Sequence, residues 1–120
     1  MSSVTITPDM IERRLKELSK EVDNSHNDLA EAEKNYFETK AKYELSLAHA
    51  RLSVASKKDI KVTVSDKADL ALVATEDLHM RMATAEALVR AARANASRIR
   101  TQVDIARSIG TSVRTSMELV

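Results

Sequence analysis

The chain has 120 residues, a formal net charge of +1 and no cysteine. The missing cysteines exclude disulfides and thiolate metal sites, and no apolar run is long enough to span a bilayer. The first residues also lack the apolar region of a signal peptide. We therefore expect one domain, residues 1–120, of a soluble cytoplasmic protein without a membrane partner.

The first predicted helix runs from Pro8 to about Ser56. The Thr7 hydroxyl can cap it, Pro8 suits its first turn, and Asp9 faces the positive end of the helix dipole. Apolar residues then recur at alternating spacings of three and four, which is typical of a coiled-coil seam. The seam positions are Ile11, Leu15, Leu18, Val22, Leu29, Ala32, Tyr36, Tyr43, Leu47, Ala50 and Val54, with Ser25 and Thr39 in two gaps.

The helical rhythm stops after the first helix. Residues 57–65 are predicted to form an extended hinge, because β-branched residues alternate within it. Ser65 or Asp66 is the expected N-cap of the next helix.

The second predicted helix covers residues 66–109. Gly110 is its expected stop and leaves residues 110–120 as a tail, although Val113 and Met117 keep the apolar spacing and could extend the helix. Its seam positions are Ala71, Ala74, Leu78, Met82, Ala85, Val89, Ala92, Ala96, Ile99, Val103 and Ala106.

These elements predict an all-α fold, a long antiparallel two-helix hairpin of coiled-coil type. Residues whose numbers add up to about 125 would pair, so that Tyr36 and Phe37 meet Leu88, and Leu15 lies near Gly110. Large apolar residues off the seam would be exposed, which favours self-association into an oligomer, with a ring as one form. The alternative is that they widen the core. They are Leu45, Leu52, Leu70, Leu72, Val73, Met80, Leu88 and Ile105.

Catalytic chemistry has little support in the sequence. There is no nucleophilic cysteine, and the one glycine permits no phosphate-binding loop. Glu76 and His79 have a metal-ligand spacing on one helix face, but a carboxylate-bridged site needs such pairs from several helices. We expect no enzyme, no cofactor and no metal.

The charges are unevenly distributed. Residues 1–80 carry 12 Lys and Arg against 15 acids, whereas residues 81–120 carry seven Arg against three acids. Four of these arginines, spaced by seven, follow one side of the second helix. This arginine row suits nucleic acid, although it could equally be a solvated face or a subunit contact. It consists of Arg93, Arg100, Arg107 and Arg114.

A second basic group surrounds the predicted hinge. Cations bind phosphates by charge and without reading the sequence, so binding here would be nonspecific and sensitive to salt. The candidate nucleic-acid-binding residues are therefore His49, Arg51, Lys57, Lys58, Lys61 and Lys67 at the hinge, with Arg93, Arg100 and Arg107 from the row.

The runs Leu47–Leu52 and Lys61–Lys67 resemble the central region of phage recombination mediators of the UvsY type, over roughly residues 40–110. Such mediators form rings, bind single-stranded DNA without sequence preference, and help a RecA-like recombinase displace single-strand-binding protein in the host bacterial cytoplasm. The resemblance implies a DNA-binding role for Arg51. His49 stands where the family has a lysine, and a neutral imidazole attracts phosphate less; neighbouring lysines can supply that charge.

Two functions of different classes follow. In the first, the chain is a single-stranded DNA-binding mediator whose cations face the strand. In the second, it is a coiled-coil scaffold or virion component whose arginines pair with a neighbouring subunit. A membrane-binding amphipathic helix is less favoured, because the second helix has few large apolar anchors.

Overall fold

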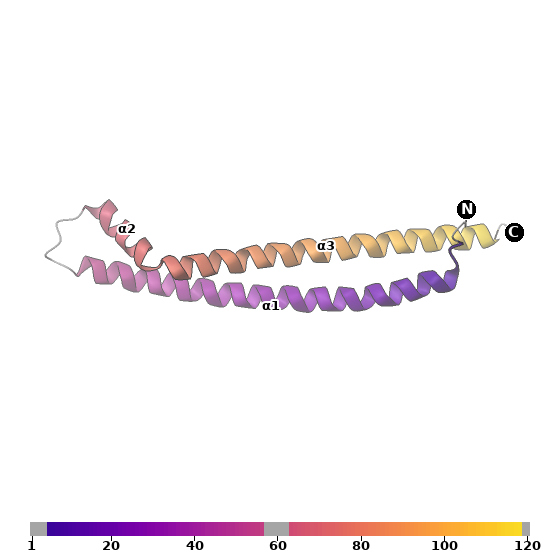
Figure 1. The fold of residues 1–120 in the computed structure, drawn as a ribbon, viewed down its shortest axis with the longest axis horizontal. Helices are drawn as coiled ribbons and strands as arrows, with labels where there is room; N and C mark the ends of the chain where they lie inside the picture. The colour runs from indigo at the N-terminus through magenta and orange to yellow at the C-terminus, as the bar shows by residue number, and fades with distance from the viewer. Residues whose placement is uncertain (1–4, 57–62, 119–120) are drawn as a thin grey trace. The chain divides into compact units, whose positions relative to one another are not determined.

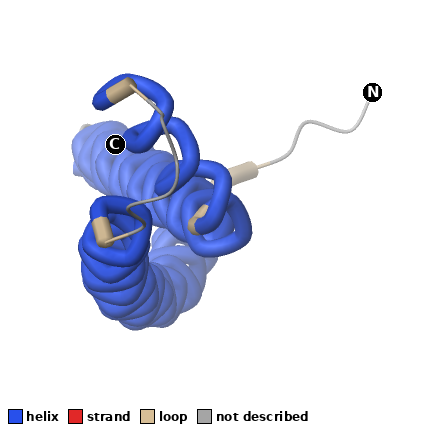
Figure 2. The backbone as a smooth tube through the Cα atoms, turned by 90° about the vertical axis from the view of Figure 1, so that its left-hand side faces the viewer, coloured by secondary structure: helices blue, strands red, loops and turns tan. Residues whose placement is uncertain are grey.

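The computed structural model describes residues 5–56 and 63–118, and every element in them is a helix (Figures 1 and 2). The helices are α1 (Pro8–Ala55), α2 (Val64–Ala74) and α3 (Glu76–Glu118). The chain divides into two compact units, which are described separately. Unit 1 combines Met1–Ala30 with Ala91–Val120, and unit 2 is Glu31–Arg90.

In unit 1, α1 and α3 run antiparallel. Ile11 of α1 lies against Gly110 of α3, and Arg14 donates a hydrogen bond to Gln102 over 3.3 Å. Leu18 is the most deeply buried large side chain, and Ile99 and Ala106 of α3 are buried as well. The core of this unit is therefore a narrow line of contacts between two helices.

In unit 2, the core is built by all three helices. Tyr43 and Leu47 of α1 pack with Ala71 of α2, and Leu78 and Met82 of α3 lie against this cluster. The Tyr43 ring also contacts the His79 ring, with centroids 5.2 Å apart.

The predicted seam and its exposed flanks are both confirmed. Every buried apolar residue belongs to the seam, and the buried Ser25 fills one of its gaps, where its hydroxyl donates to the carbonyl of Val22 over 2.8 Å. The large apolar residues predicted off the seam are all exposed, so the wider core is wrong. Phe37 and Leu88, which were predicted to meet across the hairpin, are both exposed.

The start of α1 is as predicted. The amide of Met10 donates to the Thr7 hydroxyl over 3.3 Å, and Asp9 lies in the first turn. The helix ends at Ala55, one residue before the predicted end. It is unbroken over this length because no proline after Pro8 interrupts its backbone hydrogen bonds.

The start of α2 differs from the prediction. Thr63 is the N-cap, and its hydroxyl accepts a hydrogen bond from the amide of Asp66 over 3.1 Å. Val64 and Ser65 are helical, so the predicted extended hinge is wrong for these two residues, and neither Ser65 nor Asp66 is the cap. The local capping bond outweighs the β-propensity of Val64. Thr63 has the predicted extended backbone, with φ −67° and ψ 162°, and residues 57–62 lie outside the described residues.

Thr75 divides the second predicted helix into α2 and α3, which the prediction of one continuous helix missed. Its hydroxyl donates to the carbonyls of Ala71 and Leu72 over 3.0 and 3.2 Å, and its amide donates to Leu72 over 3.1 Å. The buried hydroxyl thus occupies carbonyls at the end of α2, and the last turn tightens.

Gly110 is not a helix stop, because α3 continues to Glu118 and residues 110–118 of the predicted tail are helical. Gly110 is buried, and a Cβ added to it would lie 3.2 Å from Cγ2 of Ile11. The glycine therefore allows close approach of the helices. Leu15, the predicted neighbour, lies one turn further along and borders the same hollow.

We expect Gly110→Ala to destabilise unit 1. Alanine gains about 1 kcal/mol of helix propensity, but crowding against Ile11 costs about 1–3 kcal/mol. In an Ile11→Ala background the crowding disappears, and the same substitution should stabilise the protein. Denaturant unfolding of the four variants measures this difference, and an equal effect of Gly110→Ala in both backgrounds would contradict the proposed contact.

We expect Thr75→Val to lower the free energy of unfolding by about 1–2 kcal/mol, because a buried hydroxyl that holds two carbonyls is lost. Thr84→Val is the control. Its hydroxyl also bonds the carbonyl four residues back, but Thr84 is exposed and lies within a continuous helix. Thermal unfolding should show a clear loss for position 75 and little change for position 84; equal losses would mean that burial of the Thr75 hydroxyl is unimportant.

Candidate nucleic-acid interface

The arginine row lies on α3 in unit 1, and all four side chains are exposed. A spacing of seven residues corresponds to about 10.5 Å along the helix axis and to nearly two full turns. The guanidinium groups therefore follow one side of α3 at regular intervals.

Arg100 and Arg107 border a hollow between α1 and α3. Its volume is about 260 Å³, and α1 contributes Val22 and His26 to its wall. The apolar floor includes Val103. The site therefore combines two cations with an apolar surface and an imidazole.

Arg107 also borders a second hollow, together with Arg114. This hollow measures about 500 Å³ and is lined by Ile11 and Leu15 of α1. Arg114 is oriented by a hydrogen bond of 3.3 Å from its Nε to the carbonyl of Gly110. Because Arg107 is shared, the two hollows are neighbours, and three arginines of the row border them.

The charges around these hollows are only partly compensated. Asp104 borders the first hollow and Glu12 the second. Within residues 5–56 and 63–118, however, neither Arg100 nor Arg107 forms an ion pair. Their guanidinium groups keep their hydrogen-bond donors available to an anion.

Of the predicted hinge cluster, the structure describes His49, Arg51 and Lys67. Lys57, Lys58 and Lys61 lie outside the described residues. His49 and Arg51 are exposed in the last turns of α1, and their separation of two residues directs them to different sides.

Lys67, also predicted for this cluster, is half-buried on α2. It is four residues from the buried Ala71 and therefore shares the inner face of that helix.

Sequence reasoning missed two residues of the site. His26 is not among the predicted binding residues, and Arg114 is predicted in the arginine row but not as a binding residue. The seven-residue spacing could have indicated Arg114. The predicted pairing, in which residue numbers add up to about 125, places His26 opposite residue 99 and could have indicated it beside Arg100.

The predicted absence of a metal site remains a prediction. In the described part of the chain, no group of three or more histidines and carboxylates is close enough to hold a metal ion. His79, one of the two residues with metal-ligand spacing, packs its ring on Tyr43.

Comparison with known proteins finds no match to a family model, a curated protein or a solved structure. None of the three helices, over the residues described, is both long and apolar enough to cross a membrane.

Proposed function

We propose that this chain is a non-enzymatic, self-associating protein that binds single-stranded DNA without sequence preference and acts as a recombination mediator. In this function it helps a RecA-like recombinase replace single-strand-binding protein on the strand. The observation that carries the DNA-binding part is the pair Arg100 and Arg107, which are exposed at the edge of a hollow and form no ion pair with any residue that the structure describes.

The hollow suits a single strand better than a duplex. Guanidinium groups hold phosphates, and the apolar wall formed by Val22 and Val103 can cover part of an unstacked base. In a duplex the base faces are already stacked, so only the charge attraction would remain. The resemblance to UvsY-type mediators supports the same choice of ligand.

Self-association would multiply these contacts. Each protomer offers only a few arginines, but several protomers on one strand act at a high effective concentration. Support comes from the large apolar side chains that both units expose, among them Leu70, Val73 and Ile109.

The same apolar exposure also favours a second candidate function, a structural assembly protein. In that case the arginines of α3 pair with acids on α1 of a neighbouring subunit. Residues 8–30 of α1 carry six acids and four cations, whereas residues 91–118 of α3 carry five arginines and two acids.

We expect the double variant Arg100→Gln/Arg107→Gln to lose most of its affinity for labelled oligo-dT in fluorescence anisotropy. Each lost phosphate contact lowers the salt slope of single-strand binding by about 0.7, so the double variant should lose about 1.4. Duplex of the same length should bind more weakly to the unsubstituted protein.

Arg98→Gln is the matched control. Arg98 is exposed on the same helix, but it donates to Asn95 over 2.9 Å and borders neither hollow. Its affinity should stay within about twofold of the unsubstituted protein if the site is local. Equal losses in both variants would indicate attraction by overall charge. No binding at low salt would exclude the mediator and favour the assembly protein.

A further inference from the structure

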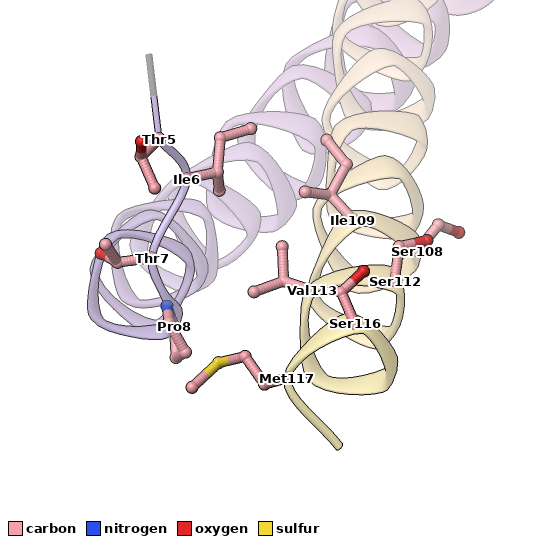
Figure 3. Close-up of a pocket in the computed structure, with 10 residues that line it drawn as sticks. All are labelled: Thr5, Ile6, Thr7, Pro8, Ser108, Ile109, Ser112, Val113, Ser116 and Met117. Carbon is pink, nitrogen blue, oxygen red and sulfur yellow. The ribbon is translucent and has the colours of Figure 1, made fainter. Parts of the chain in front are cut away.

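Unit 1 carries an apolar groove on a different side of α3 from the arginine row. Ile109, Val113 and Met117 of α3 reach toward the segment Thr5–Pro8, which contributes Ile6 (Figure 3). The hollow they border measures about 970 Å³, and none of the described residues that line it is charged.

A smaller hollow continues this groove. It shares Ile6 and Ile109 with the first, adds Met10, and measures about 220 Å³. Arg14 is the one charged side chain in its wall. Ile6, Met10, Ile109 and Met117 are all exposed, which is unfavourable in water unless another surface covers them.

Unit 2 presents the complementary feature. The helix α2 is the most apolar of the three, yet Ala71 is its one buried residue. Leu70, Leu72 and Val73 are exposed, Val73 by 69 %. This helix is therefore a convex apolar element with little to cover it.

The shapes and lengths of the two features agree. A hollow is filled by a protruding element, whereas two hollows face to face would leave a void. The 11 residues of α2 span about 16 Å, and the groove wall from Ser108 to Met117 spans about 15 Å.

The charges agree as well. Asp66 and Asp69 lie on the same face of α2 as Leu70 and Val73, whereas Lys67 lies on the opposite, inner face with Ala71. The outward face of α2 is thus apolar and acidic. The groove offers it a main hollow whose described lining is uncharged and, from its continuation, the guanidinium group of Arg14, which also pairs with Glu17 over 3.3 Å.

We propose that α2 of one copy of this chain docks into the groove of a second copy. The contact joins two different surfaces, so each copy keeps one free groove and one free α2, and repetition builds a ring or a filament. The arginine row stays uncovered, because it borders other hollows. The inference rests on the self-association included in the proposed function and names the surfaces that produce it.

The test uses the absence of cysteine from the chain. Val73→Cys protein and Ser112→Cys protein are mixed and oxidised, and the products are separated without reductant. A disulfide needs Cα atoms about 4.4–6.8 Å apart, so it reports direct contact between α2 and the groove. We expect a covalent dimer in the mixture and little in either protein alone. Ser97→Cys replaces Ser112→Cys in the control mixture, because Ser97 is exposed on α3 outside the groove.

A second measurement uses the native cysteine-free chain. Val73→Asp should reduce the mass found by light scattering at least by half, with unchanged circular dichroism, whereas Leu52→Asp should not. Leu52 is the control because it is 70 % exposed and lies on α1.

Four outcomes would overturn the docking. Ser112→Cys protein that cross-links by itself would indicate groove-to-groove pairing, and equal yields with Ser97→Cys would indicate random collision. An oligomer that persists in Val73→Asp, with no cross-link in the mixture, would leave self-association intact but exclude α2. A monomeric unsubstituted protein would refute self-association itself, whereas the Arg100 and Arg107 variants test DNA binding independently.

Discussion

The packing of a narrow seam of side chains between α1 and α3 is the constraint on which the other features depend. In unit 1, Leu18 is buried on α1, and the buried positions on α3 include Ala106 and Gly110. Small residues on one helix let the backbones approach, so a few side chains fill the whole interface. Ile11 at Gly110 is the closest example, since a methyl group at position 110 would crowd it. Nothing wider than this seam can be buried by two helices.

The narrow seam leaves both flanks of α3 open in unit 1, and the sequence gives these flanks opposite characters. Arg107 and Ile109 are two residues apart, which turns them about 200° around the helix. Arg107 borders the hollows of the basic side, and Ile109 borders the apolar groove. One helix can therefore offer phosphate-binding groups on one side and an assembly surface on the other, and occupation of one does not block the other.

In unit 2, the break at Thr75 gives α2 its separate character. A continuous helix would have kept these residues in the register of α3. The Thr75 hydroxyl instead donates to the carbonyls of Ala71 and Leu72, which ends α2. This helix contacts the core of unit 2 through Ala71. Leu70, Leu72 and Val73 of α2 are therefore exposed to solvent, and docking of α2 to a second copy would cover apolar side chains of this helix. The buried hydroxyl has its hydrogen bonds satisfied, so the break does not leave a buried polar group unpaired.

The sequence by itself determined the elements that depend on neighbours along the chain. The cap at Thr7, the length of α1, the seam and the exposure of Leu45 or Ile105 follow from periodicity and local hydrogen bonding. It also indicated the arginine row, because a spacing of seven needs no knowledge of the partner helix.

Only the tertiary structure decided the rest. Periodicity leaves the register between two helices free by about one turn, so spacing predicted Leu15 near Gly110 and only the structure placed Ile11 there. Gly110 was misjudged as a stop because its role comes from this contact with a residue far away in the sequence. The break at Thr75 was missed because its hydroxyl bonds to the carbonyls of Ala71 and Leu72 become decisive only where the residue is buried.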